Sequence, residues 1–313
     1  MGNISYHIIA TALVGGVIVY RRMLVTLDGS ELSEVVLPYV KELVGSLGLD
    51  VVLLHVCKPE ERELVPLHRD YIEHKAAVIK GQAKEVWKKS AVRPVKEGVE
   101  VRGELASGYP AEEILRYADE NSIDLILMAT HGRSGFKRWA IGSVADKVIH
   151  ASKVPVWLVP ARGSGDVTYD MWPKKTVVVP LDGSELAEAV LPHVKALAEQ
   201  SGVELVEVIL LRVVESPVMS DHYFSNIPET REAIEKYLAR LEERLRKAGL
   251  SVQSRVLTGE PAEQIVDYAG ATPFSLVVMS THARSGLSRW VLGSVAMKVV
   301  SGISGPILLV RPL

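Results

Sequence analysis

Short runs of consecutive apolar residues alternate along the chain with segments in which apolar residues recur at helical spacing. Clear, mostly apolar runs occupy residues 51–56, 124–128 and 154–159, with His55 and Asp124 as polar exceptions. Runs of this kind are typical of strands in a sheet that helices cover on both faces. Further along the chain, Ile234, Leu238, Leu241 and Leu245 recur at helical spacing and mark one face of a helix. The alternation predicts a parallel, doubly wound α/β sheet.

The same succession of segments occurs twice, with a period of about 150 residues. The matched segments are residues 24–38 with 178–192, 51–56 with 208–213, 108–114 with 259–265, and 128–143 with 279–294. A period of this length indicates duplicated domains and not a solenoid. We expect an apolar extension at 1–20, a first domain at 21–162, a linker at 163–173 and a second domain at 174–313.

Within each copy, the first strand is expected to end at an aspartate, Asp28 or Asp182. The following helix in the first copy should begin at Ser30 as its N-cap. Pro110 and Pro261 fit the first position of the crossover helices, where a missing N–H costs nothing. The other expected elements are proline-rich loops at 58–68 and 215–228, third strands at 99–105 and 251–257, and fifth strands at 154–159 and 305–310.

The fifth strands carry a further expectation about how the two halves meet. Each would lie at the exposed edge of its sheet, and each is apolar. An apolar edge strand needs a partner, because its unpaired backbone groups otherwise template aggregation. We therefore expect residues 154–159 to pair with residues 307–310 in an intramolecular pseudo-dimer.

One glycine-rich segment, residues 128–143, joins the apolar run at 124–128 to a helical pattern, and residues 279–294 repeat it. Glycines let the backbone approach a ligand closely, while free N–H groups at a helix N-terminus attract an anion. The segment predicts a phosphate site to which Ser143 and Ser294 each donate a hydroxyl. The alternative is that both serines are helix N-caps, which Asp146 supports in the first copy and Met297 does not in the second.

These segments resemble the nucleotide-binding signature of the universal stress protein family, G-x2-G-x9-G-[ST]. The matching positions are Ala129, Gly132 and Gly142-Ser143, then Ser280, Ala283 and Gly293-Ser294. The resemblance implies two tandem Rossmann-like domains, each with a five-stranded parallel sheet of order 3-2-1-4-5. It also implies an ATP-type ligand (ATP, ADP or AMP, with or without Mg²⁺) and a regulatory or protective role in stress response. Ala283 departs from the signature, so the second half could instead be a nucleotide-free interaction module.

The candidate binding residues each have a structural alternative. Asp28 and Asp182, which the resemblance places near adenine and ribose, could accept from a ribose hydroxyl or only shape an Asp-Gly-Ser turn. Val56 and Val213 form an apolar wall for a base or ordinary core. Arg133 would neutralise phosphate charge or be a solvated loop residue. The full set is Asp28, Val56, Met128, Gly132, Arg133, Gly142, Ser143 and Val144, with Asp182, Val213, Met279, Ala283, Arg284, Gly293, Ser294 and Val295 in the second copy.

Catalysis is not indicated by the residue pattern. His131 and His282 have no nearby Ser or Cys nucleophile at a useful spacing with an orienting acid. The chain contains no Walker loop, no G-x-G-x-x-G after the first strand, and no Cys/His spacing that suggests zinc. We assign no catalytic residue and expect at most slow ATP hydrolysis, with a weak adenine-nucleotide hydrolase or transferase as the alternative.

Composition narrows the expected partners and location. The formal net charge of −2 gives no general attraction to nucleic acid or to an anionic membrane. Cys57 is the single cysteine, which excludes an intrachain disulfide and favours a reducing cytoplasm. Association of two chains into a homodimer is compatible with these features.

Residues 8–20 form an apolar run that is shorter than the roughly twenty residues needed to span a bilayer. No Lys or Arg precedes it, as a signal peptide requires, whereas Arg21 and Arg22 follow it. The run has no counterpart in the second half. We hypothesise that the native protein begins at Val17 or Val19, and an intact-mass measurement on the native protein tests this.

Overall fold

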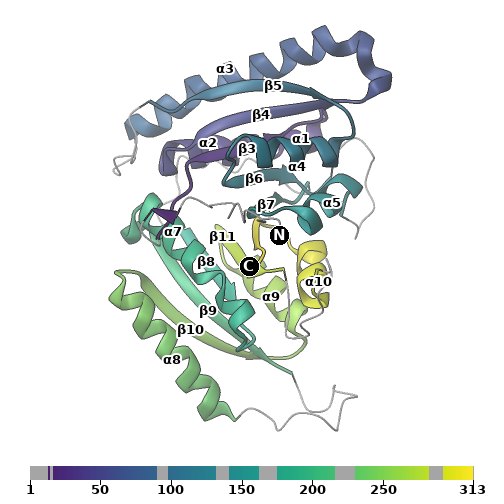
Figure 1. Cartoon of the computed structure of the whole chain (residues 1–313). Helices are drawn as coiled ribbons and strands as arrows, with labels where there is room; N and C mark the ends of the chain where they lie inside the picture. Colours follow the sequence, from purple (N-terminus) through teal and green to yellow (C-terminus); the bar gives the residue numbers. More distant parts are fainter. Residues whose placement is uncertain are drawn as a thin grey trace, which may run out of the picture.

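The computed structural model describes residues 13–14, 17–89, 98–131, 141–161, 175–215, 230–281 and 292–312. Two lobes, one from each half of the sequence, meet in the middle of the molecule (Figure 1). Four candidate residues, Gly132, Arg133, Ala283 and Arg284, lie outside the described ranges, as do the expected linker and residues 216–228 of the second expected loop.

Each half alternates strands with helices. The first half contains β3 (Arg22–Thr26), α1 (Glu31–Glu34), α2 (Leu37–Leu47), β4 (Asp50–Cys57), η1 (Pro59–Leu64), α3 (Val65–Lys89), β5 (Val101–Ser107), α4 (Pro110–Glu120), β6 (Leu125–Ala129), α5 (Ser143–Ala151) and β7 (Val156–Val159). The second half contains β8 (Lys175–Pro180), α6 (Glu185–Glu188), α7 (Leu191–Ser201), η3 (Val203–Leu205), β9 (Val206–Val214), α8 (Arg231–Lys247), β10 (Ser251–Thr258), α9 (Pro261–Ala271), β11 (Ser275–Ser280), α10 (Ser294–Gly302) and β12 (Ile307–Val310). A separate antiparallel pair, β1 (Leu13–Val14) and β2 (Val17–Ile18), precedes them.

The strands of both halves form one ten-stranded sheet, in the order β10-β9-β8-β11-β12-β7-β6-β3-β4-β5. Numbered within its own half, each set of five is parallel and has the order 3-2-1-4-5, which confirms the predicted fold. The halves join where β12 pairs antiparallel with β7, with Leu308 opposite Trp157. This pairing confirms the predicted internal pseudo-dimer.

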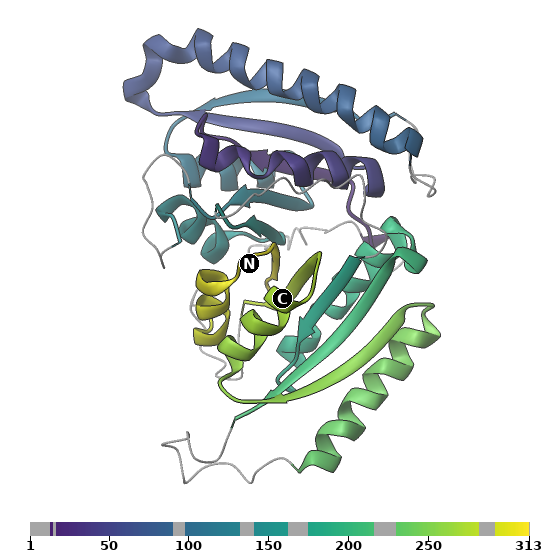
Figure 2. The same ribbon diagram turned by 180° about the vertical axis from the view of Figure 1, so that it is seen from behind.

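Helices cover both faces of the sheet, and the apolar runs serve both cores. Val51 and Leu53 of β4 enter one core with α2 and α3, while Val52 and Leu54 enter the other with α4 and α5. Side chains alternate between the two faces of a strand, so a strand covered on both faces is apolar at every position. The view from behind shows the long helices α3 and α8 at opposite ends of the molecule (Figure 2).

Side chains reinforce the junction between the halves. Tyr20 is 1% exposed, and its hydroxyl lies 2.8 Å from Nδ1 of His193 in α7. The Tyr20 backbone N–H donates to Gln200 at 3.0 Å, and the Gln200 amide donates back to the Tyr20 carbonyl at 2.8 Å. Burial, with a smaller effect of Asp124, raises the pKa of Tyr20 above its usual range, so the hydroxyl stays neutral. Lys175 and Glu42 add an ion pair.

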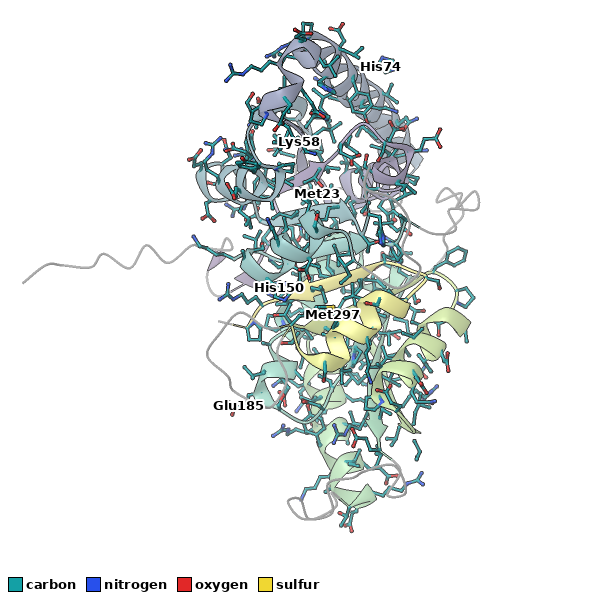
Figure 3. The ribbon with its side chains drawn as sticks, turned by 90° about the vertical axis from the view of Figure 1, so that its right-hand side faces the viewer. Met23, Lys58, His74, His150, Glu185 and Met297 are labelled. Atoms are coloured by element: carbon teal, nitrogen blue, oxygen red, sulfur yellow. The ribbon has the colours of Figure 1, made fainter. Side chains whose placement is uncertain are left out.

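On the other side of the junction, α5 and α10 lie next to each other. The backbone N–H of Leu292 donates to Nε2 of His150 at 3.4 Å. His150 and Met297, from α5 and α10 respectively, are labelled close together at this boundary (Figure 3). The two lobes are therefore connected by strand pairing in the sheet and by contacts on both of its faces.

The structure corrects one expectation about the loops. Residues 58–68 were expected to be a loop, but residues 59–64 form the short helix η1, and α3 begins directly after it at Val65. Pro59 and Pro66 occupy first-turn positions, where proline is compatible with a helix. Among the helices within the described ranges, none is long and apolar enough to cross a membrane.

Candidate functional site

A cavity of about 190 Å³ opens beyond the carboxyl ends of β3 and β6 in the first half. These are the neighbouring strands at which the strand order reverses, the usual ligand position in an open α/β sheet. The predicted residues that line this cavity are Asp28, Val56, Met128, Gly142, Ser143 and Val144. They come from parts of the sequence more than a hundred residues apart, and the fold brings them together.

The Asp-Gly-Ser turn shapes one side of the cavity. Gly29 has φ +82°, a conformation that strains other residues. Oδ1 of Asp28 accepts from the backbone N–H of Ser30 at 3.0 Å and from its hydroxyl at 2.6 Å. Ser30 in turn caps α1 by accepting from Ser33 N at 3.2 Å, which confirms the predicted N-cap. Asp28 therefore organises the turn and also lines the cavity.

The glycine loop is closed at its base by a backbone hydrogen bond. The N–H of Gly142 donates to the carbonyl of Thr130 at 2.8 Å. A Cβ on Gly142 would lie only 3.0 Å from that carbonyl oxygen, so this position favours glycine because two backbone segments meet there. Thr130 is fixed in turn, since its N–H donates to the Val159 carbonyl at 2.9 Å.

The N-terminus of α5 forms the other side of the cavity. Its N-cap is Gly142, without a side-chain capping bond, and Ser143 is the first helical residue. The alternative that Ser143 is the N-cap is therefore wrong by one position, and the same holds for Ser294, which follows the N-cap Gly293. First-turn N–H groups have no acceptor within their helix and favour an anion. The exposed Ser143 and its neighbours Val144 and Ala145 line the cavity at this point.

Of the two predicted valines, Val56 lies in the cavity wall, and both Val56 and Val213 pack against the core. Val56 lines the cavity and is also packed, half-buried, against the core. Val213 occupies the matching place on β9 and packs in the same way. Met128 and Met279 are buried at 3% and 7% exposure.

Sequence reasoning missed other residues of the cavity wall, among them His55, Lys58 and Glu61. Lys58 is exposed at the end of β4 (Figure 3), and its backbone N–H donates to Glu61 Oε2 at 3.2 Å. The available signal was topological, because in a 3-2-1-4-5 sheet the end of strand 2 lies beside strand 1. His131, to which no role was assigned, also lines the cavity, with Nδ1 3.0 Å from Thr130 Oγ1.

The second half repeats this backbone arrangement. Gly183 has φ +86°, and Oδ1 of Asp182 accepts from Ser184 N at 2.9 Å and from its hydroxyl at 2.6 Å. Gly293 N–H donates to the Thr281 carbonyl at 2.8 Å, as Gly142 does to Thr130. Ser294 and Val295 begin α10 in the same way that Ser143 and Val144 begin α5.

The surroundings of the second site differ at one buried position. Arg212, 9% exposed, stands where the first half has His55, and its Nη1 donates to the Leu181 carbonyl at 3.3 Å. Nearby, burial raises the pKa of Tyr237, with a further contribution from Glu188, while Arg212 opposes the shift. A positive charge therefore lies at the end of β9, where it contacts the backbone of Leu181.

The fold and this crevice define a class of protein: tandem doubly wound α/β domains, each with an acidic turn and a glycine-closed loop at the strand-order reversal. The model described as the Universal stress protein family matches residues 19–160 and 174–311. The chain belongs to the universal stress protein family.

Individual relatives agree with this assignment. Universal stress protein MJ0531 of Methanocaldococcus jannaschii is 27% identical over 156 residues, covering 50% of this chain and 91% of that protein. Universal stress protein Mb2028c of Mycobacterium bovis is 26% identical over 229 residues, covering 71% of this chain and 75% of its own length. The crystal structure of a universal stress protein from Archaeoglobus fulgidus has a TM-score of 0.63 at 22% identity, covering 93% of this chain and 98% of that one, which shows the shared two-domain fold.

A universal stress protein has also been crystallised in complex with cAMP. It is 18% identical to this chain, with a TM-score of 0.34, and covers 46% of this chain and 98% of its own. Nucleotide binding is a property of that protein.

Proposed function

We propose that the first half binds an adenine nucleotide (ATP, ADP or AMP) and that binding serves a regulatory or protective role, with little or no hydrolysis. The observation that carries the proposal is that six predicted residues line one cavity that ends at the N-terminus of α5. Backbone amides and a hydroxyl meet there, which is the arrangement that suits a phosphate.

The lining suggests how the ligand would lie. Val56 and Met128 offer apolar contact for the base, and Asp28 lies where a ribose hydroxyl could donate to it. The cavity is smaller than the roughly 300–1,000 Å³ of pockets that enclose a drug-sized ligand. A nucleotide would fill it with the base and ribose and leave its phosphates at the rim, over Ser143 and Val144.

The proposal of slow ATP hydrolysis or none rests on the interactions of the residues in the cavity wall. Within the described part of the cavity wall, Oδ1 of Asp28 is engaged by Ser30, and His131 is hydrogen-bonded to Thr130. An enzyme that hydrolyses or transfers the nucleotide remains the alternative, and multiple turnover of ATP at a useful rate would establish it.

Calorimetric titration with ATP, ADP and AMP, on protein stripped of bound nucleotide, tests the proposal. Replacing Val56 with Trp should fill the cavity and abolish binding in the first half. Val213→Trp is the matched control, because it adds the same bulk at the equivalent position of the second half. If the wild-type chain binds no adenine nucleotide, or if Val56→Trp leaves the stoichiometry unchanged, the proposed site is wrong.

The same titration decides the role of the second half. A stoichiometry near two indicates two working sites, and a value near one indicates that the second half is a nucleotide-free interaction module. The observation that favours the module is Ala283, which replaces the second glycine of the signature. In the module case, Val213→Trp leaves nucleotide binding unchanged.

We also propose a cytoplasmic location, which rests on the single cysteine, and a homodimer as the form in solution. Cell fractionation tests the location. Sedimentation equilibrium tests the dimer. A role for Mg²⁺ is tested by repeating the ATP titration in the presence of a chelator.

A further inference from the structure

Three metal-ligating side chains converge behind the sheet of the first half, on the side covered by α3. His55 and Cys57 are two residues apart on β4, so they point to the same face of the strand. His68 is in the first turn of α3, after the chain has passed through η1. The ligand atoms of all three residues lie within 4.8 Å of one another.

All three side chains are buried. His55 and Cys57 are each 1% exposed, and His68 is 6% exposed. The two imidazole rings are stacked, with centroids 4.2 Å apart and an angle of 21° between the ring planes. Nε2 of His68 has no hydrogen-bond partner among the described residues, and a buried polar atom without a partner destabilises the fold. A ligand that takes up the ring nitrogen would remove this destabilisation.

We propose that His55, Cys57 and His68 bind a transition-metal ion of the Zn²⁺ type. Bonds of roughly 2.0–2.3 Å in a tetrahedral site place the ligand atoms about 3.3–3.8 Å apart. Ligand atoms within 4.8 Å of one another exceed that spacing by at most about 1.0–1.5 Å, which rotations of the side chains can supply. Two imidazoles and a thiolate favour Zn²⁺ over Mg²⁺ or Ca²⁺, which prefer oxygen ligands.

The site would tie the end of a strand to the start of a helix. A metal bound to Cys57 and His68 would close the segment that contains η1. Three protein ligands leave one tetrahedral position for water or another group. His55 is also part of the cavity wall, so the ion would lie beside the candidate nucleotide site and separate from the α5 N-terminus.

In the second half, two of the three ligand positions carry other residues, so this half serves as an internal control. In the repeat, Arg212 stands at the position of His55 and Val214 at the position of Cys57. A buried guanidinium and an isopropyl group cannot ligate a metal. One ion per chain is therefore expected, whatever the number of nucleotides bound.

Titration of Zn²⁺ into chelator-treated, nucleotide-free protein tests the site, together with the metal content measured after dialysis. The wild-type chain should bind one Zn²⁺. Cys57→Val, which installs the residue of the second half, and His68→Ala should each weaken binding by more than about 100-fold. The matched control is His74→Ala, since His74 is an exposed histidine of the same helix (Figure 3) and its loss should change nothing.

Co²⁺ provides a readout that needs no variant. Because Cys57 is the single cysteine, a sulfur-to-cobalt charge-transfer absorption in wild-type protein reports a Cys57–metal bond directly. The band should appear at one equivalent of Co²⁺ and disappear when Zn²⁺ is added. Absence of the band, failure to retain Zn²⁺ through dialysis, or equal Zn²⁺ affinity in the wild type, Cys57→Val and His68→Ala would overturn the proposal. If Cys57→Val fails to fold, the Co²⁺ band and His68→Ala decide the matter.

Discussion

The two halves have the same backbone arrangement and differ in the buried side chains near the end of the second strand. Each half builds the same strand order, the same positive-φ glycine after its aspartate, and the same glycine N-cap before its last helix. Behind the end of the second strand, however, the first half places two stacked histidines and a thiol, and the second half places Arg212 near Tyr237. The duplicated features are those that shape the crevice, and the divergent ones surround it.

This contrast separates two kinds of constraint. The turn and the loop base are set by backbone geometry, because a glycine with φ near +85° or a close approach between backbones tolerates few other residues. A buried position behind a strand accepts different side chains, provided that each fits the available space. The halves are therefore free to acquire different chemistry on one scaffold. The following predictions test how far the equivalence of the halves extends.

The largest effect is expected at the junction between the halves. Trp157 and Leu308 occupy equivalent positions in the two copies, and they also lie opposite each other where β7 pairs with β12. Trp157→Ala removes a side chain that is only 6% exposed and should lower the free energy of unfolding by about 3–5 kcal/mol. Urea denaturation measures the change. Tyr109→Ala is the control, because Tyr109 is 65% exposed and should cost less than about 0.5 kcal/mol. A loss as small as that of the control would show that the junction adds little stability.

The second largest effect is expected in the free energy of unfolding when the pH is lowered. Burial lowers the pKa of His193 from 6.5 to about 4, whereas the first half has Tyr39 at this place in the repeat. Between those two pH values the unfolded chain binds a proton that the folded chain does not. His193 should therefore make the protein less stable as pH falls from 7.5 to 4.5, by about 2.5 kcal/mol.

Urea unfolding at the two pH values measures this loss. His193→Gln should be less sensitive to acid than the wild-type chain by the same amount, because glutamine does not titrate. Equal sensitivity in both proteins would contradict the assignment.

Gly142→Ala should have an intermediate effect. Its new methyl group would lie 3.0 Å from the Thr130 carbonyl oxygen, and crowding of this kind costs about 1–3 kcal/mol. Gly293→Ala is the matched variant, because Gly293 makes the same 2.8 Å hydrogen bond. Thermal unfolding followed by circular dichroism measures both. Similar losses would show that the two loop bases are equally tight, and no loss in Gly142→Ala would mean that the contact relaxes freely.

The smallest effect is expected at the two N-caps. Ser30 accepts from Ser33 N at 3.2 Å, and Ser184 accepts from Ala187 N at 3.1 Å. Ser30→Ala and Ser184→Ala should each cost about 1 kcal/mol, since each leaves a helix N–H without its acceptor. Chemical denaturation of the single and double variants measures the costs and whether they add. Costs that differ by more than about 1 kcal/mol would show that the two turns are not equivalent.

The sheet, the junction and six of the residues that line the cavity could be predicted from the sequence, because these depend on local patterns that occur twice. Apolar runs marked the strands, and repetition fixed the correspondence between Asp28 and Asp182 and between Gly142 and Gly293. The N-cap interpretation was off by one residue, because a glycine can cap without a side chain. The loop expected at 58–68 was wrong because proline was read as a break, although it fits the first turn of a helix.

The histidine–cysteine cluster was missed for a different reason. His55 and Cys57 could be placed on one strand face from their spacing, but His68 follows eleven residues after Cys57, which is not a usual zinc spacing. Only the path through η1 returns the chain to the same face of the sheet. Contacts of this kind depend on the geometry of a connection, and residue types alone do not fix that geometry.

Continuity of the sheet across β7 and β12 has a consequence for assembly. Both strands belong to one polypeptide, so the junction forms without a second molecule and does not dissociate on dilution. The edges of β7 and β12 are therefore already paired and cannot bind another strand. Any self-association of this protein must therefore use a surface other than these two strands, and its dependence on concentration will report on that surface alone.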